Sequence, residues 1–341
     1  MTYHVAKTKV PEYCLLIEGR RPMNYAMRIT LRIFLLCVFT LLSAPSARSA
    51  EKEKLQVQKP YLVQFKTPRS LQFCGERVPL ERADIWERMD REFLLALGKE
   101  PRVILWLKRS KRYFPYIEER LKYYNLPDDL KYVVIAESDF YPNSISNKGA
   151  AGLWQFIKDT GARFGLKNHD QIDERYSFPK STNAALQYLS SLYALFGRWT
   201  LAVAAYNCGE ERVRREIEEQ GVRDYYDLDL PQETEEYLFR IMAIKIILSN
   251  PSEYGFELAE ADYYPPFDVK EVSFYLPRPV HIKVIADAAQ TTFKHIRDLN
   301  PELRGHYIPD GAYTLYIPRK NAEAFQERLK ARLEEDVKIK K

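Results

Sequence analysis

The sequence is poor in cysteine and histidine. Only four Cys and five His occur in 341 residues, and only Cys74 and Cys208 lie beyond residue 50. No Cys or His pair has the spacing of a zinc site, so we expect no bound metal and no cofactor. The scattered His residues also disfavour a nucleophile activated by histidine. A core of this size needs no disulfide, so we expect two free thiols, with one Cys74–Cys208 bridge as the alternative.

The sequence also lacks a basic face. The net charge is +5, but residues 1–50 hold seven Lys and Arg against two Asp and Glu. The rest of the chain is therefore neutral, with 45 residues of each sign. Binding to phosphates requires a basic surface or run, and none is present. We therefore expect no nucleic-acid partner.

A long membrane-spanning run is missing as well. Arg28 and Arg32 precede an apolar run at 33–42, and small residues follow up to residue 50. The run is shorter than the roughly 20 residues that a comfortable span requires. We therefore assign residues 1–50 to a secretory signal peptide region, in which 1–26 could be an extension from a misassigned start. We expect an exported protein without a stable membrane span, and an uncleaved anchor is the alternative.

Strand patterns are nearly absent before residue 255, where helical spacing dominates instead. The predicted fold class is mainly α, with an all-helical domain followed by a small β-α-α-β unit. The helices are expected at residues 82–97, 103–111, 116–124, 182–196, 199–206, 210–219 and 233–249, and later at 282–289 and 293–299. The predicted organisation is a linker and strap at 51–80, the helical domain at 81–256, a linker at 257–271, the small unit at 272–319 and a solvated helical tail at 320–341. The two strands of the small unit are expected at 272–276 and 313–317.

Glu137 is a carboxylate on the apolar stripe of a predicted helix that opens at Asp128. Leu130, Val133, Val134 and Glu137 follow the i, i+3, i+4, i+7 spacing of one helical face. Burial at such a position raises the pKa of a carboxyl group, so Glu137 could hold a proton near neutrality and donate it as a general acid. The plain alternative is a buried Glu that pairs with an Arg or an amide.

The residues after Glu137 predict a groove. Pro142 is expected to end the helix, and a polar loop containing Gly149 and Gly152 would then cross the space that Glu137 faces. Leu153 is expected to start another apolar helix, which would place the next two residues at its beginning. This arrangement would put one acid at the floor of a groove.

Three blocks carry a specific resemblance. Glu-Ser-x-Phe-x-Pro starts at Glu137, a Ser follows nine residues later, and Gly-Ala-x-Gly-Leu starts at Gly149. Ala-Ala-Tyr-Asn-Cys-Gly-Glu occupies 204–210, and Leu-Pro-Gln-Glu-Thr-Glu-Glu-Tyr occupies 230–237. From about residue 73 to 318 the chain resembles the lytic transglycosylases of the soluble lytic transglycosylase and goose-type lysozyme superfamily. The order and spacing of the blocks are most similar to the membrane-bound lytic transglycosylase D type.

The resemblance implies a lysozyme-like helical domain and a peptidoglycan lyase that needs no cofactor. Glu137 would protonate the oxygen between N-acetylmuramic acid and N-acetylglucosamine, then act as a base toward the sugar's own 6-hydroxyl. A 1,6-anhydro-muramyl end would form without consuming water. The implied partner is the peptidoglycan glycan strand, and the implied location is the periplasm or cell envelope of a Gram-negative bacterium. The oligomeric state is left open.

The resemblance also nominates the residues that line the site. These are Ser146, Gln155, Tyr206, Asn207, Glu233 and Tyr237, with Ser138 and Trp154 as two further candidates. Plain roles remain open for several of them: Ser146 as a turn residue, Gln155 as a hydrogen bonder at a helix start, Tyr237 as core, and Trp154 as core or sugar platform.

The carboxy-terminal unit resembles a LysM glycan-binding module. The similar segments are Ile285-Ala286, Leu299-Asn300-Pro301 and 313–318. The usual Gly-Asp-Thr near the start of the module is replaced around Val280-His281, so the unit either binds glycan or braces the helical domain. A second departure is Cys208, which stands where the family more often has Ala or Ser.

Two rival functions remain. One is a muramidase of the same fold that adds water and requires a second carboxylate. Asp139 lies two positions after Glu137 and would point about 200° away on a continuous helix, whereas Asp159, Asp170 and Asp173 are not placed by the sequence. The other rival is a non-catalytic peptidoglycan-binding protein that retains the groove.

Overall fold

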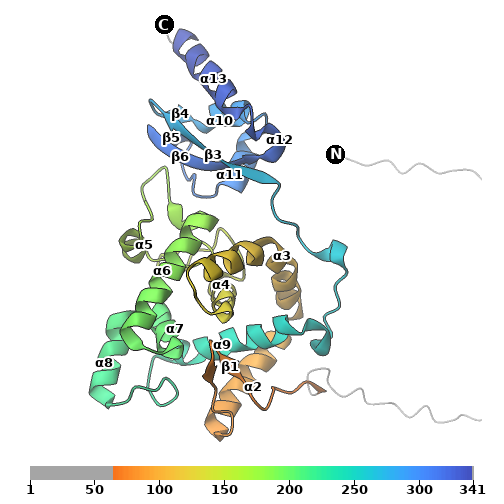
Figure 1. Cartoon of the computed structure of the whole chain (residues 1–341), viewed down its shortest axis with the longest axis vertical. Coiled ribbons are helices and arrows are strands. Elements are labelled where there is room, and N and C mark those ends of the chain that lie inside the picture. Colours follow the sequence, from red (N-terminus) through yellow and green to blue (C-terminus); the bar gives the residue numbers. More distant parts are fainter. Residues whose placement is uncertain (1–63, 340–341) are drawn as a thin grey trace, which may run out of the picture. The chain divides into compact units, whose positions relative to one another are not determined.

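The computed structural model describes residues 64–339, with side chains described through residue 334. All of these residues fall within one compact unit. Two hydrophobic cores form inside it, one within the helical domain and one within the small carboxy-terminal domain. The predicted mainly α fold class is confirmed (Figure 1).

The predicted signal peptide region lies outside the described residues. Among the described residues, no helix combines the length and apolar character required to cross a bilayer.

The helical domain begins with a short hairpin and continues almost entirely as helices. Its elements are β1 (Gln72–Phe73), β2 (Glu76–Arg77), α2 (Ala83–Leu97), α3 (Glu100–Tyr123), η2 (Asp128–Tyr132), α4 (Val133–Ser138), α5 (Lys158–Arg163), η3 (Glu174–Tyr176), α6 (Phe178–Phe196), α7 (Trp199–Cys208), α8 (Glu210–Gln220), α9 (Gln232–Ser249) and η4 (Pro251–Tyr254). Another 3-10 turn, η5 (Glu260–Asp262), follows this domain. Within the described residues, Cys74 and Cys208 are free thiols, as expected.

The core of the helical domain follows from the apolar spacing of its helices. On α2 the stripe Ile85, Met89, Phe93 and Leu97 is fully buried, as the sequence predicts. By contrast, α9 is apolar on nearly all sides, and helices with this pattern are normally enclosed by others. It packs against α2, α4 and α7, and Figure 1 shows it passing beneath α4. The short α4 therefore rests on a rigid, buried support.

Helix α3 differs from the prediction of two helices. It runs without interruption through Pro115, where a break was predicted. A proline in a helix removes one backbone hydrogen bond, which costs about 3 kcal/mol. Buried side chains on both sides of Pro115, among them Trp106, Tyr113, Ile117 and Leu121, hold the two halves in one helix.

The small domain is the predicted β-α-α-β unit. Its strands are β3 (Val269–Leu276), β4 (Val280–His281), β5 (Tyr307–Ile308) and β6 (Gly311–Pro318), and its helices are α10 (Ile282–Ala288) and α11 (Phe293–Leu299). The long strands β3 and β6 pair antiparallel along their full length. Helix α11 packs against β6 and α10 packs against α11, and they supply Ile296 and Ile285, respectively, to the second core.

The predicted solvated tail is wrong for its first part. After α12 (Arg319–Ala322), the helix α13 (Phe325–Ile339) packs against α10. Phe325 is fully buried and Leu329 nearly so, and both belong to the second core. The charged residues between them masked an apolar spacing of four, which is the period of one helical face.

The two domains contact each other through the segment 171–176 of the helical domain. Ile172 forms an isolated antiparallel bridge with Leu303, and its side chain belongs to the second core. Beside this bridge, Glu302 is 6% exposed, and burial raises the pKa of its carboxyl group to about 7. Its cavity is also lined by Ser177 and Lys180 of the helical domain.

Glu302→Gln should make the protein more stable at alkaline pH. The folded protein retains the Glu302 proton, whereas the unfolded chain releases it near pH 4.5, so the free energy of unfolding falls as the pH rises from about 4.5 to about 7. The expected loss is up to about 3 kcal/mol. Denaturant unfolding should show the Glu302→Gln variant more stable than the parent at pH 8 and similar at pH 5. Equal pH dependence of the two proteins would contradict this assignment.

Candidate active site

The helix that carries Glu137 ends earlier than predicted. Helix α4 stops at Ser138 because Asp139 and Phe140 both adopt left-handed conformations, with φ of 53° and 57°. The prediction that Pro142 ends the helix is therefore wrong. Arg102 Nε and Trp106 Nε1 each donate to Asp139 Oδ1 at 2.7 Å. These bonds offset the cost of a left-handed non-glycine residue and fix the end of α4 directly after Glu137.

The loop after α4 folds back on itself instead of starting a helix at Leu153. Isolated bridges join Ile145 to Ala151 and Ala151 to Phe156. Gly152 and Gln155 have φ of 80° and 49°, which a right-handed helix does not permit. The predicted helix is therefore wrong at its start, and α5 begins only at Lys158.

Arg175 holds this loop from behind. Its Nη1 donates to the backbone oxygens of Gly149 at 2.8 Å and Phe156 at 3.0 Å. Asp173 fixes the guanidinium group through Nε at 2.9 Å and Nη2 at 2.7 Å. The loop and Arg175 approach so closely that a Cβ atom on Gly152 would lie 2.0 Å from the Arg175 carbonyl oxygen. Only glycine fits at this position.

A groove of about 770 Å³ opens over α4, the loop, α7 and the start of α9. It brings together seven of the nine residues that the sequence nominates, from four separate parts of the chain. They are Glu137, Ser146, Gln155, Tyr206, Asn207, Glu233 and Tyr237.

Ser138 and Trp154 do not line this groove. Ser138 is buried and donates to the Val134 carbonyl oxygen at 3.1 Å within α4. Trp154 is fully buried and its Nε1 donates to Thr182 Oγ1 at 2.9 Å. Trp154 is therefore a core residue and does not form a sugar platform, because its ring faces α6.

Glu137 is half-buried at the groove and hydrogen-bonded to Tyr237, whose hydroxyl donates to Glu137 Oε1. Loss of water around the carboxyl group raises the pKa of Glu137 to about 7. The Tyr237 hydrogen bond opposes that rise, the charge of Glu233 adds to it, and the charge of Arg240 opposes it. Glu137 can therefore carry a donatable proton near neutral pH.

Backbone and side-chain contacts fix the other groove residues. Tyr206 donates to the Trp154 carbonyl oxygen at 2.8 Å, and Asn207 Oδ1 accepts from Thr234 Oγ1 at 2.8 Å. Ser146 Oγ accepts from the Ala150 N–H at 3.0 Å, which supports the turn role that the sequence left open.

Gln155 shapes the loop instead of starting a helix. Its amide nitrogen donates to the backbone oxygens of Ser144 at 3.2 Å and Gly152 at 2.7 Å. The side chain therefore ties the two ends of the loop together while lining the groove.

Two other carboxylates line the groove. Glu210 accepts from Tyr188 at 2.7 Å and forms an ion pair with Arg163 at 2.7 Å, and its pKa is lowered despite burial. Glu233 is exposed in the first turn of α9. Asp139 faces a different cavity together with Ser138, so it is not a second groove carboxylate.

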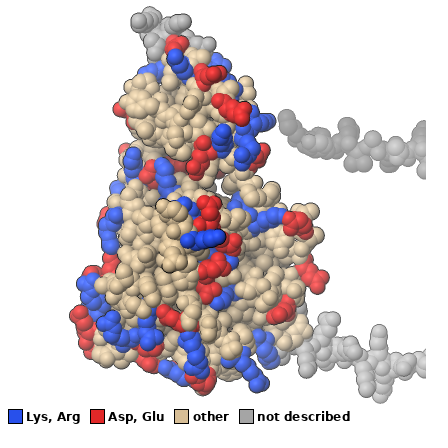
Figure 2. Space-filling view, viewed as in Figure 1, with Lys and Arg blue, Asp and Glu red and all other residues tan. Residues whose placement is uncertain are grey.

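The sequence reasoning missed three cations that line the groove. They are Lys148, Arg212 and Arg240, of which Arg240 is engaged by Glu92 and Glu236. Each of the three lies within five residues of a motif residue in the sequence, and this closeness could have identified them as groove residues. Elsewhere, Figure 2 shows cationic and anionic side chains interspersed on the visible face, without a broad area of one sign.

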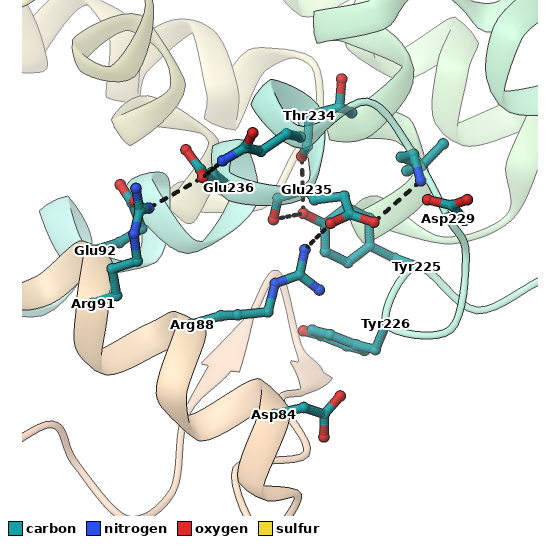
Figure 3. A network of polar contacts seen from close by, with 12 residues as sticks. Asp84, Arg88, Arg91, Glu92, Tyr225, Tyr226, Asp229, Thr234, Glu235 and Glu236 are labelled. Carbon is teal, nitrogen blue, oxygen red and sulfur yellow. Dashed lines mark hydrogen bonds and ion pairs between the residues drawn. The ribbon is translucent and has the colours of Figure 1, made fainter.

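The first turn of α9 is anchored by a polar network (Figure 3). Arg88 on α2 forms an ion pair with Glu235 at 2.6 Å, and the Tyr225 hydroxyl donates to the Glu235 carbonyl oxygen at 2.8 Å. The same hydroxyl lies 3.0 Å from the Thr234 carbonyl oxygen. The network therefore fixes the turn that presents Glu233 to the groove and precedes Tyr237.

Two family models match the chain. The model described as the transglycosylase SLT domain matches residues 114–228, which include Glu137, Ser146, Gln155, Tyr206 and Asn207. The model described as the LysM-like domain of lytic transglycosylase MltD matches residues 274–332. The chain thus contains a segment similar to the transglycosylase SLT domain followed by one similar to the MltD-type LysM-like domain, and the resemblance to lytic transglycosylases is confirmed.

The similar curated proteins include membrane-bound lytic murein transglycosylase D of Escherichia coli strain K12 and that of strain O6:H1. Each is 34% identical over 227 residues, which is 65% of this chain and 49% of the relative. The chain therefore spans about half the length of these relatives. The 70 kDa soluble lytic transglycosylase of Escherichia coli is a solved structure with 18% identity and a TM-score of 0.37, covering 52% of this chain and 33% of that chain.

Gly152→Ala should destabilise the protein far more than Gly149→Ala. Both positions have a left-handed φ, which costs alanine about 1 to 2 kcal/mol. Only at Gly152 would the new Cβ also strike the Arg175 carbonyl group, which adds about 1 to 3 kcal/mol of strain. The free energies of unfolding of the two variants measure the difference. Equal losses would show that the loop does not press against Arg175.

Proposed function

We propose that this protein is a peptidoglycan lytic transglycosylase in which Glu137 acts first as general acid and then as general base. The observation that carries the proposal is the carboxyl group of Glu137, which has a pKa of about 7 and a Tyr237 hydrogen bond at the floor of an open groove. The two matched domain models and the curated relatives support the same reaction class.

The proposed reaction needs one carboxyl group. Protonated Glu137 donates its proton to the oxygen that links N-acetylmuramic acid to N-acetylglucosamine, and the bond to the muramyl anomeric carbon breaks. The muramyl N-acetyl group closes on that carbon as an oxazolinium-like intermediate. Glu137, now a carboxylate, takes the proton of the 6-hydroxyl, whose oxygen attacks the anomeric carbon as the bond from that carbon to the N-acetyl oxygen breaks and the N-acetyl group is restored. The proton returns to Glu137, the product is a 1,6-anhydro-muramyl end, and no water is consumed.

We assign supporting roles to the other groove residues. Tyr237 holds Glu137 and stabilises its charged form, which suits a group that must act as base in the second step. Ser146, Gln155, Tyr206 and Asn207 present polar atoms to the substrate's N-acetyl and hydroxyl groups from the loop and from α7. Glu233 acts through charge, because its carboxylate raises the pKa of Glu137.

A hydrolytic muramidase is the second candidate, and Glu233 is the observation that favours it. Inverting glycosidases use a general base that activates water opposite the general acid. Glu233 is a groove carboxylate that influences Glu137 electrostatically, so it satisfies the chemical requirement for such a base. The two candidates differ in their products by one molecule of water.

We also propose an envelope location, with export of the mature chain to the periplasm. Two observations support this location. Residues 1–50 are predicted to be a signal peptide region, and the curated relatives are named membrane-bound lytic murein transglycosylases. The substrate class would be peptidoglycan strands, to which the MltD-type LysM-like domain could bind as a second contact.

Glu137→Gln should slow cleavage strongly, because an amide cannot donate the required proton. We expect a rate loss of about 10²- to 10⁴-fold, the usual contribution of a general acid. Mass spectrometry of digested peptidoglycan measures both rate and product. Anhydro ends, lighter by one water, support the lyase. Hydrolytic ends would establish the muramidase instead, and unchanged solubilisation by Glu137→Gln would remove Glu137 from the mechanism.

The pH dependence of cleavage should move in opposite directions in two variants. In the parent, kcat/KM should fall as the pH rises through about 7, since only protonated Glu137 donates. Tyr237→Phe removes a bond that stabilises the charged form, so the alkaline limb should move to higher pH. Glu233→Gln removes a neighbouring negative charge, so the limb should move to lower pH. A limb that stays in place in both variants would mean that another group controls it.

A further inference from the structure

The LysM-like unit, residues 274–332, touches the helical domain at the docking segment Gln171–Tyr176. Backbone hydrogen bonds join the Asp173 N–H to the Glu302 carbonyl oxygen at 2.9 Å and the Arg304 N–H to the Gln171 carbonyl oxygen at 2.8 Å. Ile172 lies between these bonds and is buried in the second core. The docking segment therefore belongs to the packing of both domains.

The same segment holds the groove loop 144–156. Asp173 donates its N–H to the LysM-like unit, while its carboxylate fixes Arg175 at 2.7 Å. Arg175 in turn donates to the carbonyl oxygens of Gly149 and Phe156. Asp173 and Arg175 are each about 90% buried, so this chain of bonds is shielded from water.

Arg304 of the LysM-like unit makes two further contacts with the helical domain. Its guanidinium carbon lies 4.2 Å from the centroid of the Tyr176 ring, a distance typical of a cation–π contact. Its Nη1 donates to Asn143 Oδ1 at 3.3 Å, directly before the groove loop. Arg304 is exposed as a whole residue, so its removal does not open either core.

We propose that Arg304 is a positioning residue, through which the LysM-like unit keeps the groove loop in the conformation that binds substrate. The unit would then contribute to catalysis by holding the loop that carries Ser146 and Gln155. This contribution would be separate from any binding of glycan by the unit itself. The kinetic part of this inference rests on the proposed function, whereas the structural part does not.

The inference predicts a specific kinetic signature. When the binding-competent conformation is only partly populated, the apparent dissociation constant rises by the inverse of that fraction. Loss of Arg304 should therefore raise KM, while kcat stays nearly constant because bound substrate restores the loop. A variant that is partly misfolded would instead lower kcat and leave KM unchanged.

The test compares Arg304→Ala with Arg319→Ala in the full chain. Arg319 is a matched control, since it is an exposed arginine paired with Asp268 at 2.8 Å beyond β6, away from the docking segment. Hydrogen exchange is measured at the amides of Ala150, Ala151 and Gly152, which bond within the loop. Initial rates are measured with soluble peptidoglycan fragments that carry stem peptides.

We expect faster exchange at the three amides and a KM about fivefold higher in Arg304→Ala, with Arg319→Ala like the parent. Unchanged exchange in Arg304→Ala would overturn the proposal, as would a fall in kcat at constant KM. If the parent itself cleaved no peptidoglycan, the proposed function would fail, and the exchange measurement alone would still decide whether Arg304 holds the loop.

Discussion

The arrangement of the groove depends on the hydrogen bond between Tyr237 and Glu137. These residues are a hundred positions apart in the chain, and the bond joins the short helix α4 to the buried helix α9. Helix α4 has only six residues, which is too short to be stable by itself. Its acid is held by three supports: the apolar face on α9, the Tyr237 hydroxyl, and the left-handed end at Asp139.

This arrangement reconciles two opposing demands on one carboxyl group. Desolvation favours the neutral acid, whereas the tyrosine hydrogen bond favours the carboxylate. A pKa near 7 results from their near balance, together with the opposing charges of Glu233 and Arg240. A group that donates a proton in one step and takes one in the next benefits from such a balance, because neither form is strongly disfavoured.

The sequence predicted the parts of the site that follow from periodicity. The apolar stripe beside Glu137 and the face on α2 are regular patterns, and the seven groove residues came from motifs in register. The failures occurred where the backbone leaves regular conformations. Nothing in the type of Asp139 or Gln155 announces a left-handed φ, since the partners that stabilise it, such as Arg102, come from distant segments. The sequence left Trp154 open between core and sugar platform and wrongly predicted that the segment of α13 is solvated, because burial depends on which element packs above a residue.

The bridge between Ile172 and Leu303 also constrains the order in which the chain can assemble. Ile172 precedes α6, whereas Leu303 comes after α11, so the docking segment is synthesised long before its partner. The helices of the first core can pack while Ile172 still lacks the second core. The hydrogen bonds that join the docking segment to Glu302 and Arg304 can form only after those two residues have been synthesised. A truncated chain ending before Glu302 would thus carry Glu137 in a groove whose loop lacks the support of the LysM-like unit.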